Sequence, residues 1–171
     1  MESSIIFGET DHFAIRCIKN RLAKPRELNN YCHWILGNKL IGDPQEPCYL
    51  PLWLATLGKF KESTLPEILA EPELAADDIE SIFNTLQEQG QEGEWKENSM
   101  GWESRRITLD ETQDAWLLMA HREADGLRFT WKGWRAPCPL AEIGKVYSCW
   151  ASTASVMKSI DECLEFYRAD F

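Results

Sequence analysis

The chain has 171 residues, of which 44% are hydrophobic, and its formal net charge is −10. This length predicts a single domain over residues 1–171, with enough apolar material to fold without a metal or a disulfide. The start of the chain, with Glu2 and no small-residue cleavage site, predicts no signal peptide, and no apolar run approaches the roughly 20 residues of a membrane helix. We therefore expect a cytoplasmic protein without a membrane partner.

Short apolar or alternating runs, separated by turn residues, predict strands in the first part of the chain. Ile5–Phe7 and Phe13–Lys19 should form a hairpin. Tyr31–Leu36 should pair with Lys39–Ile41 through a turn at Gly37-Asn38. Because short turns connect these strands, their pairing should be antiparallel.

The middle of the chain has helical spacing followed by a stretch without period. Apolar residues three and four apart predict a helix over Tyr49–Phe60. Asp77 or Asp78 can cap a second helix, which Gly90 ends. The apolar stripe of this second helix, which should face the core, consists of Ile79, Ile82, Phe83 and Leu86. Gln87 to Glu103 has neither helical nor strand periodicity, which predicts a loop or an irregular hairpin.

The last part of the chain returns to strands and ends in a helix. The predicted strands are Arg105–Leu109, Ala115–Arg122, Leu127–Trp134 and Lys145–Ala151. Asp125-Gly126 predicts a hairpin between the second and third of them, because glycine adopts positive φ at little cost. Ser152 or Thr153 can cap the terminal helix. About seven strands and about three helices predict an α+β fold with a largely antiparallel sheet.

Six cysteines are spread along the chain: Cys17, Cys32, Cys48, Cys138, Cys149 and Cys163. No two of them have the Cys-x-x-Cys spacing of zinc and redox sites. Disulfides belong mainly to oxidising compartments, which the absence of an export signal argues against. We expect the cysteines to be small buried apolar residues.

The sequence lacks the common catalytic signatures. It has no Gly-x-Ser-x-Gly elbow, no phosphate-binding loop and no dinucleotide fingerprint. Its three histidines lack the i, i+4 spacing of a helical zinc site. Glu92, Glu94 and Glu97 could hold a hard cation, but they lack the ligand spacing of a calcium loop. We therefore predict a protein that is not an enzyme and uses no metal or cofactor.

Negative charge is concentrated in the middle quarter of the chain. Between Glu62 and Glu103 twelve acids and one base, Lys96, give −11, whereas the rest of the chain sums to +1. Such a segment would repel nucleic acid and anionic membranes and would attract a basic protein. The alternative is a set of solvated helix faces that supports solubility, with Asp77 and Asp78 acting as helix caps.

Eight tryptophans are many for a chain of this length. Trp34, Trp53, Trp116 and Trp150 lie in apolar patterns that are typical of a core. The other four are flanked by polar residues: Trp95, Trp102, Trp131 and Trp134. Either they cover the edge of their own domain, or, since tryptophan is enriched in interface hot spots, those beside acids form a docking loop. The residues predicted to bind a partner are Asp77, Asp78, Glu80, Glu88, Glu92, Glu94, Trp95, Glu97, Trp102 and Glu103.

Three motifs in the first third of the chain resemble a known family. They are Ile6-Phe7-Gly8-Glu9 followed by His12-Phe13-Ala14-Ile15, then Cys32-His33-Trp34-Ile35-Leu36-Gly37-Asn38-Lys39-Leu40-Ile41-Gly42-Asp43, and the segment Tyr49–Leu57. They resemble the Immunity protein 42 family of bacterial polymorphic-toxin systems, mainly over residues 5–60 and more weakly in the C-terminal strand and helix. The resemblance implies a cytosolic antidote, of the contact-dependent growth inhibition type, that binds the C-terminal domain of its cognate toxin.

The negative charge of the segment from Glu62 to Glu103 predicts the nature of that toxin. Toxins that act on DNA or RNA are typically basic because they must neutralise phosphates. We therefore predict a nuclease-like toxin domain as the partner. Two other functions fit the residues: a small intracellular enzyme with a site assembled from scattered residues, or an adaptor that binds some other basic protein.

Overall fold

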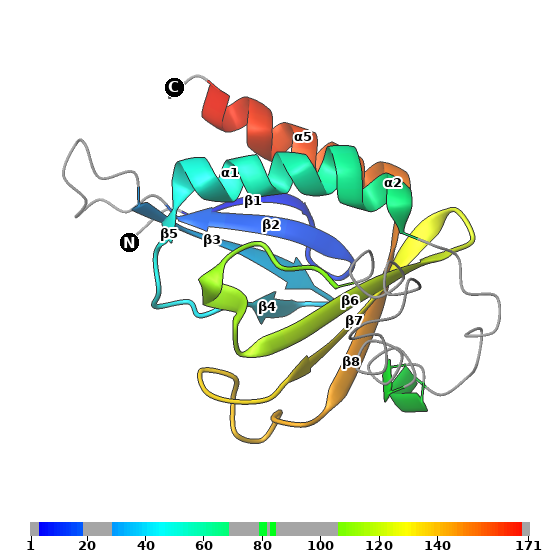
Figure 1. The fold of residues 1–171 in the computed structure, drawn as a ribbon. Helices are drawn as coiled ribbons and strands as arrows, with labels where there is room; N and C mark the ends of the chain where they lie inside the picture. The colour runs from blue at the N-terminus through cyan, green and yellow to red at the C-terminus, as the bar shows by residue number, and fades with distance from the viewer. Residues whose placement is uncertain (1–3, 19–28, 69–78, 82, 85–105, 169–171) are drawn as a thin grey trace, which may run out of the picture.

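The computed structural model of the chain describes residues 4–18, 29–68, 79–81, 83–84 and 106–168 (Figure 1). Two antiparallel sheets and two main helices account for most of these residues. The α+β class predicted from the sequence is confirmed. The strands are divided between two sheets, however, and the sequence pattern did not predict this division.

The first sheet contains the N-terminal strands. In spatial order they are β1 (Ser4–Glu9), β2 (Phe13–Ile18), β3 (Asn29–Leu36) and β4 (Lys39–Ile41), with β5 (Cys48–Tyr49) paired to the start of β3. Gly37 and Asn38 join β3 to β4, and both have positive φ, 53° and 64°. This is the backbone that a two-residue type I′ hairpin requires, so the predicted turn is confirmed.

The second sheet contains the C-terminal strands β6 (Trp116–Glu123), β7 (Gly126–Gly133) and β8 (Val146–Ser152), in that order. The strand predicted at Arg105–Leu109 is wrong as a regular strand. In the described part of that segment, Arg106 forms an isolated bridge with Met119. After this bridge, and before β6 begins, the chain forms the short helical turn η3 (Glu111–Gln113). There the Asp110 side chain accepts a hydrogen bond from the Thr112 backbone N–H.

The β6–β7 hairpin forms where it was predicted, but its glycine has a different role. The loop residues are Ala124 and Asp125, and the positive φ (53°) falls on Ala124. Gly126 is already the first residue of β7. A Cβ atom on Gly126 would lie 2.5 Å from the Ala151 carbonyl oxygen and 2.5 Å from the Trp150 ring. Glycine is therefore required at position 126 because β8 approaches too closely for a side chain.

Two helices cover one face of the first sheet (Figure 1). The first, α1 (Leu50–Lys59), continues through the wider turn η1 (Phe60–Thr64) into α2 (Leu65–Glu67). The second is the terminal helix α5 (Thr153–Arg168). α5 packs on β1 and β2, and α1 packs on β3 and on α5. No helix within the described ranges is both long enough and apolar enough to cross a membrane.

Four aromatic rings join the two sheets and the end of α1. The ring of Trp34, fully buried on β3, lies 5.0 Å from that of Phe13, 5.1 Å from that of Phe60 and 6.0 Å from that of Phe129, between centroids. Phe13 and Phe129 also stack on each other. One cluster of buried hydrophobic side chains extends from this aromatic junction through both sheets and both helices. Because the sheets share this core, we keep the assignment of residues 1–171 to one domain as a proposal.

The cysteines and two of the four tryptophans predicted to be core lie where the sequence placed them. All six cysteines are buried free thiols. Trp34 and Trp53 belong to the core, and Trp116 and Trp150 are half-buried. Trp131, which polar neighbours suggested to be at an edge, is buried and stacks on Tyr147. On a strand, sequence neighbours point to the opposite face, so their polarity does not describe the side on which Trp131 lies.

A buried histidine connects β3 to the turn after β4. Nε2 of His33 donates a hydrogen bond to the Asp43 carbonyl oxygen at 2.7 Å. Burial lowers the pKa of His33, and the hydrogen bond to Asp43 opposes this shift in part. His33 is therefore expected to be neutral in the folded protein at neutral pH.

Replacing Trp34 should cost much of the stability of the fold. We expect Trp34→Ala to lower the free energy of unfolding by about 3–5 kcal/mol, because it leaves a cavity among three other rings. Trp134→Ala is the control, since Trp134 is 54% exposed, and it should change stability by less than about 0.5 kcal/mol. Urea unfolding measures both, and equal stabilities of the two variants would contradict the role of the aromatic junction.

Opposite effects are expected in the β6–β7 hairpin. Ala124→Gly should stabilise the protein by about 0.5–1 kcal/mol, because glycine adopts the positive φ there without strain. Gly126→Ala should destabilise it by about 1–3 kcal/mol, because the new methyl group collides with β8. Thermal unfolding of the two variants checks the assignment, which fails if glycine at position 124 destabilises the protein.

Acidification should destabilise the fold through His33. The unfolded imidazole takes up a proton below pH about 6.5, whereas the folded imidazole resists protonation down to a lower pH. The free energy of unfolding should therefore fall as the pH drops from about 6.5 towards the folded pKa, by at most about 1.4 kcal/mol per pH unit for this group. Urea unfolding between about pH 7.5 and about pH 5 should show a smaller fall for His33→Gln. Identical pH profiles would rule out His33 as the source.

Candidate partner-binding surface

One of the ten residues that the sequence predicted to bind a partner, Glu80, belongs to the described part of the chain. Glu80 is exposed on a short helical stretch formed by residues 79–81 and 83–84, as expected for an acid on the outer side of that helix. The other nine lie outside the described residues: Asp77, Asp78, Glu88, Glu92, Glu94, Trp95, Glu97, Trp102 and Glu103.

The helical stretch that carries Glu80 packs on the second sheet. Phe83 is fully buried against Met119 of β6, and the Lys132 ammonium group lies 5.9 Å from the centre of the Phe83 ring. The predicted apolar stripe is therefore confirmed at Phe83. It is wrong at Ile79, which is 39% exposed, and Ile82 and Leu86 lie outside the residues that the structure describes. Met119 belongs to a cluster separate from the main core, so Phe83 packs the helical stretch that carries Glu80 on the outer face of this sheet.

A largely apolar groove opens between β4 and the loop that follows β7. Its volume is about 310 Å³. Its apolar lining includes Leu40, Trp116, Trp131 and Tyr147 from the two sheets, and Pro44, Pro137 and Pro139 from loops. The loop of residues 134–145 forms one wall, and we call the hollow the Trp134 groove after the first residue of that loop.

One ion pair lines the Trp134 groove. Nζ of Lys39 lies 2.6 Å from Oε1 of Glu142 and 4.6 Å from the centre of the Tyr147 ring. The hydrogen bond to Glu142 raises the pKa of Lys39. The Cys138 thiol also lines the groove, and burial raises its pKa, so at neutral pH it is a protonated thiol rather than a nucleophile. The described groove residues are therefore suited to binding rather than to covalent chemistry.

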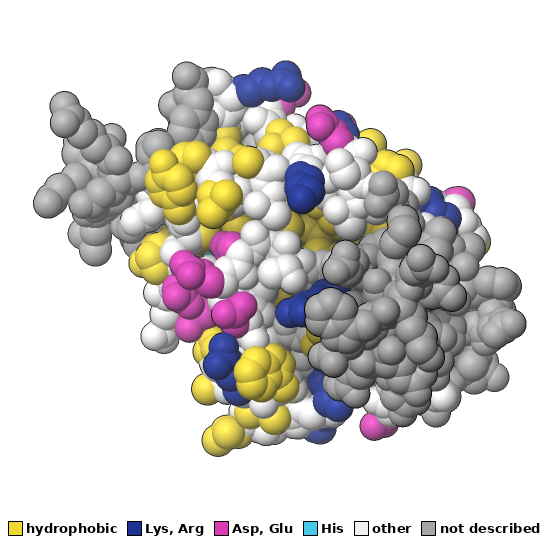
Figure 2. All heavy atoms as spheres, in the orientation of Figure 1, with side chains coloured by type: hydrophobic (Ala, Val, Ile, Leu, Met, Phe, Trp, Pro, Cys, Tyr) yellow, Lys and Arg dark blue, Asp and Glu magenta, His cyan; other side chains and the backbone are white. Residues whose placement is uncertain are grey.

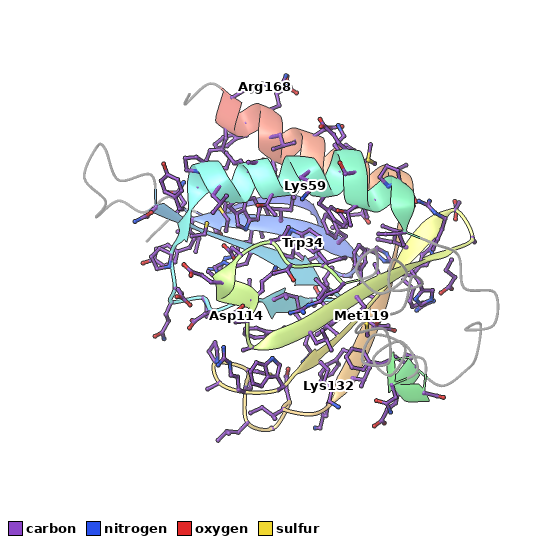
Figure 3. The ribbon with its side chains drawn as sticks, viewed as in Figure 1. Trp34, Lys59, Asp114, Met119, Lys132 and Arg168 are labelled. Carbon is purple, nitrogen blue, oxygen red and sulfur yellow. The ribbon has the colours of Figure 1, made fainter. Side chains whose placement is uncertain are left out.

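An acidic cleft of about 370 Å³ adjoins the groove at Pro137, which lines both. Its carboxylates are Asp43, Glu46, Glu111 and Asp114, and Arg135 is the one cation among the described residues that line it. Figure 2 shows acidic side chains gathered on this face, around the place where Figure 3 labels Asp114. In this view the acids are not covered by other segments of the chain.

Two turns distant in the sequence hold these carboxylates together. The Asp43 backbone N–H donates to the Thr112 carbonyl oxygen at 2.9 Å, which joins the turn after β4 to the turn before β6. The carbonyl oxygen of Asp43 is held by His33, and the Thr112 hydroxyl donates to Asp110 at 2.6 Å. Because backbone bonds and buried side chains position both turns, the cleft is fixed by the fold.

Two exposed hydrophobic side chains belong to the loop of residues 134–145, which contributes lining residues to both the groove and the cleft. The side chain of Trp134 is 54% exposed and that of Leu140 is 88% exposed. The Arg135 guanidinium lies 4.4 Å from the centre of the Trp134 ring and 3.9 Å from an Asp114 carboxylate oxygen. The Trp134 ring therefore packs on a residue that lines the cleft, and a large exposed ring of this kind is typical of a protein-binding surface.

The sequence did not reveal the groove or the cleft. Asp43 and Glu46 are far along the chain from Glu111 and Asp114, and outside the middle segment acids and bases nearly balance. Sequence reasoning did single out Trp134 as a ring among polar residues. That exposed tryptophan, followed by Arg135 and a proline-rich loop, was the available signal.

A group of exposed side chains at the β1–β2 turn could hold a metal ion. Glu9, Asp11 and His12 offer ligand atoms within 4.8 Å of one another. Nδ1 of His12 already bonds to the Trp150 carbonyl oxygen at 3.0 Å, which leaves Nε2 as the possible ligand. Acids at an exposed turn need no ion, so we assign no function to this group. Glu92, Glu94 and Glu97, weighed earlier as cation ligands, lie outside the described residues.

Comparison with known proteins identifies the fold and the family. The crystal structure of CdiI from Burkholderia dolosa AUO158 is similar, with a TM-score of 0.71 and 12% sequence identity over 95% of this chain and 99% of that chain. At this identity the likeness concerns the fold. No curated protein matches the sequence. The family model described as Immunity protein 42 matches residues 5–166, well beyond the N-terminal motifs that suggested it. The chain therefore belongs to the Immunity protein 42 family.

Proposed function

We propose that this chain is a cytoplasmic immunity protein that binds the C-terminal domain of a cognate toxin and neutralises it without catalysing a reaction. The observation that carries the proposal is the family match over residues 5–166. The likeness of the fold to CdiI supports it across both sheets and the terminal helix. Neutralisation by binding requires a surface complementary to the toxin rather than a catalytic centre.

We further propose that the toxin is basic and nuclease-like. The segment from Glu62 to Glu103 carries a net charge of −11. A domain that cleaves DNA or RNA must bind phosphates and therefore presents lysine and arginine side chains. Carboxylates that face those side chains compete with the phosphates of the substrate, and they also accelerate the encounter of the two proteins.

In this proposal the acidic segment contributes the steering contacts. The charge comes from Asp77, Asp78, Glu80, Glu88, Glu92, Glu94, Glu97 and Glu103, and Trp95 and Trp102 add apolar area. Charge at the rim of an interface acts mainly on the rate of association, and rings buried in an interface act mainly on the rate of dissociation. Substitutions of the acids should therefore change the association rate, and substitutions of the two tryptophans should change the dissociation rate.

The steering role can be measured with the cognate toxin domain. Reversing the charge of Glu92, Glu94 and Glu97 to lysine should slow association by about tenfold and flatten its dependence on salt. The matched control reverses Asp125, Glu162 and Glu165, exposed acids on the β6–β7 hairpin and α5, and so changes the net charge equally. Stopped-flow kinetics at low and high salt measures both.

Equal effects in the test and control variants would assign steering to net charge rather than to the acidic segment. A wild-type chain that neither binds the toxin domain nor restores growth to cells expressing it would contradict the proposed function itself.

A further inference from the structure

We infer that the Trp134 groove, with the acidic cleft beside it, is a docking site for a basic segment of the toxin domain, and that it takes a lysine or arginine side chain next to an apolar one. The inference rests on the proposed function for the identity of the partner. It goes beyond that function by naming a second contact surface, outside the acidic middle segment.

The groove itself selects against an anionic ligand. Its own cation, Lys39, already donates to Glu142 and lies over the Tyr147 ring. A phosphate or carboxylate entering the groove would have to break this pair and would meet the carboxylates of the neighbouring cleft. The aromatic and proline lining instead suits the methylene stem of a long basic side chain or a neighbouring apolar residue.

The cleft supplies the complementary charge. The described residues that line the cleft include four carboxylates and one cation, Arg135. A cationic group of the partner that enters the cleft is therefore attracted by several carboxylates at once. Arg135 itself packs over Trp134 and reaches towards Asp114. A guanidinium or ammonium group of the partner could bind in the same way, over an aromatic ring and near a carboxylate. The positive charge of Arg135 also partly neutralises the carboxylates of the cleft and so weakens their attraction for such a group.

The surface is formed before the partner arrives. The Trp134 N–H donates to the Ala115 carbonyl oxygen at 3.0 Å, and the Gly144 N–H donates to the Gly133 carbonyl oxygen at 2.8 Å, which pins both ends of the loop. The Asp43 N–H donates to Thr112 across the cleft. Docking on a fixed surface loses little conformational entropy, so an exposed ring there can contribute strongly to affinity.

The test uses substitutions for which the inference predicts opposite changes in the rate of association, together with one that should change the rate of dissociation. The full chain is bound to the toxin domain, and association and dissociation rates are measured. Trp134→Ala should raise the dissociation rate by about tenfold or more. Glu111→Gln combined with Asp114→Asn should slow association by about threefold or more, whereas Arg135→Gln should quicken it by about twofold, because it unmasks the carboxylates.

Matched controls separate the site from general surface effects. Leu52→Ala removes a side chain that is 61% exposed on α1, and Asp125→Asn combined with Glu162→Gln removes two exposed acids elsewhere. Both should leave the rates within twofold of wild type. Every variant should keep the thermal unfolding of wild type, because all the changed side chains are exposed.

The outcomes separate this inference from the proposed function. If the Trp134 and cleft variants bind like wild type while reversal at Glu92, Glu94 and Glu97 weakens binding, the inference is overturned and the function stands. If the wild-type chain does not bind the toxin domain, both are overturned. If the chain alone forms a dimer that Trp134→Ala dissociates, a second copy occupies the groove and the inference is likewise overturned.

Discussion

The packing of Trp34 against three other rings is the constraint on which the rest of the structure depends. Phe13 comes from β2, Phe60 from the end of α1 and Phe129 from β7, so a single side chain is in contact with both sheets and the helical layer. Each sheet buries its apolar face against other elements, and the aromatic junction lies where these elements meet, so the interior is continuous.

The same constraint places the candidate docking surface. The Trp134 groove takes Lys39 and Leu40 from the first sheet and Trp131 and Tyr147 from the second. Its shape is therefore a consequence of the angle at which the two sheets meet. A binding surface built across two sheets is rigid because each wall is anchored in the core.

Local rules recovered most elements and failed at identifiable points. The Gly37-Asn38 hairpin, α1 and the terminal helix were predictable because turn chemistry and helical spacing act over a few residues. Gly126 was assigned the positive φ that belongs to Ala124, because its real constraint is the approach of Trp150 from another strand. Trp131 was misplaced for a similar reason, since polar neighbours say nothing about the face on which a strand residue lies.

The sequence by itself determined most of the described strands and helices, the burial of the cysteines, the family and the concentration of negative charge between Glu62 and Glu103. These follow from periodicity, composition and motifs that are local along the chain. Only the tertiary structure decided that the strands separate into two sheets, and that Asp43 and Glu46 line one cleft with Glu111, Asp114 and Arg135. The backbone hydrogen bond from Asp43 to Thr112 joins those two turns, and a pairing between such distant residues leaves no periodicity in the sequence.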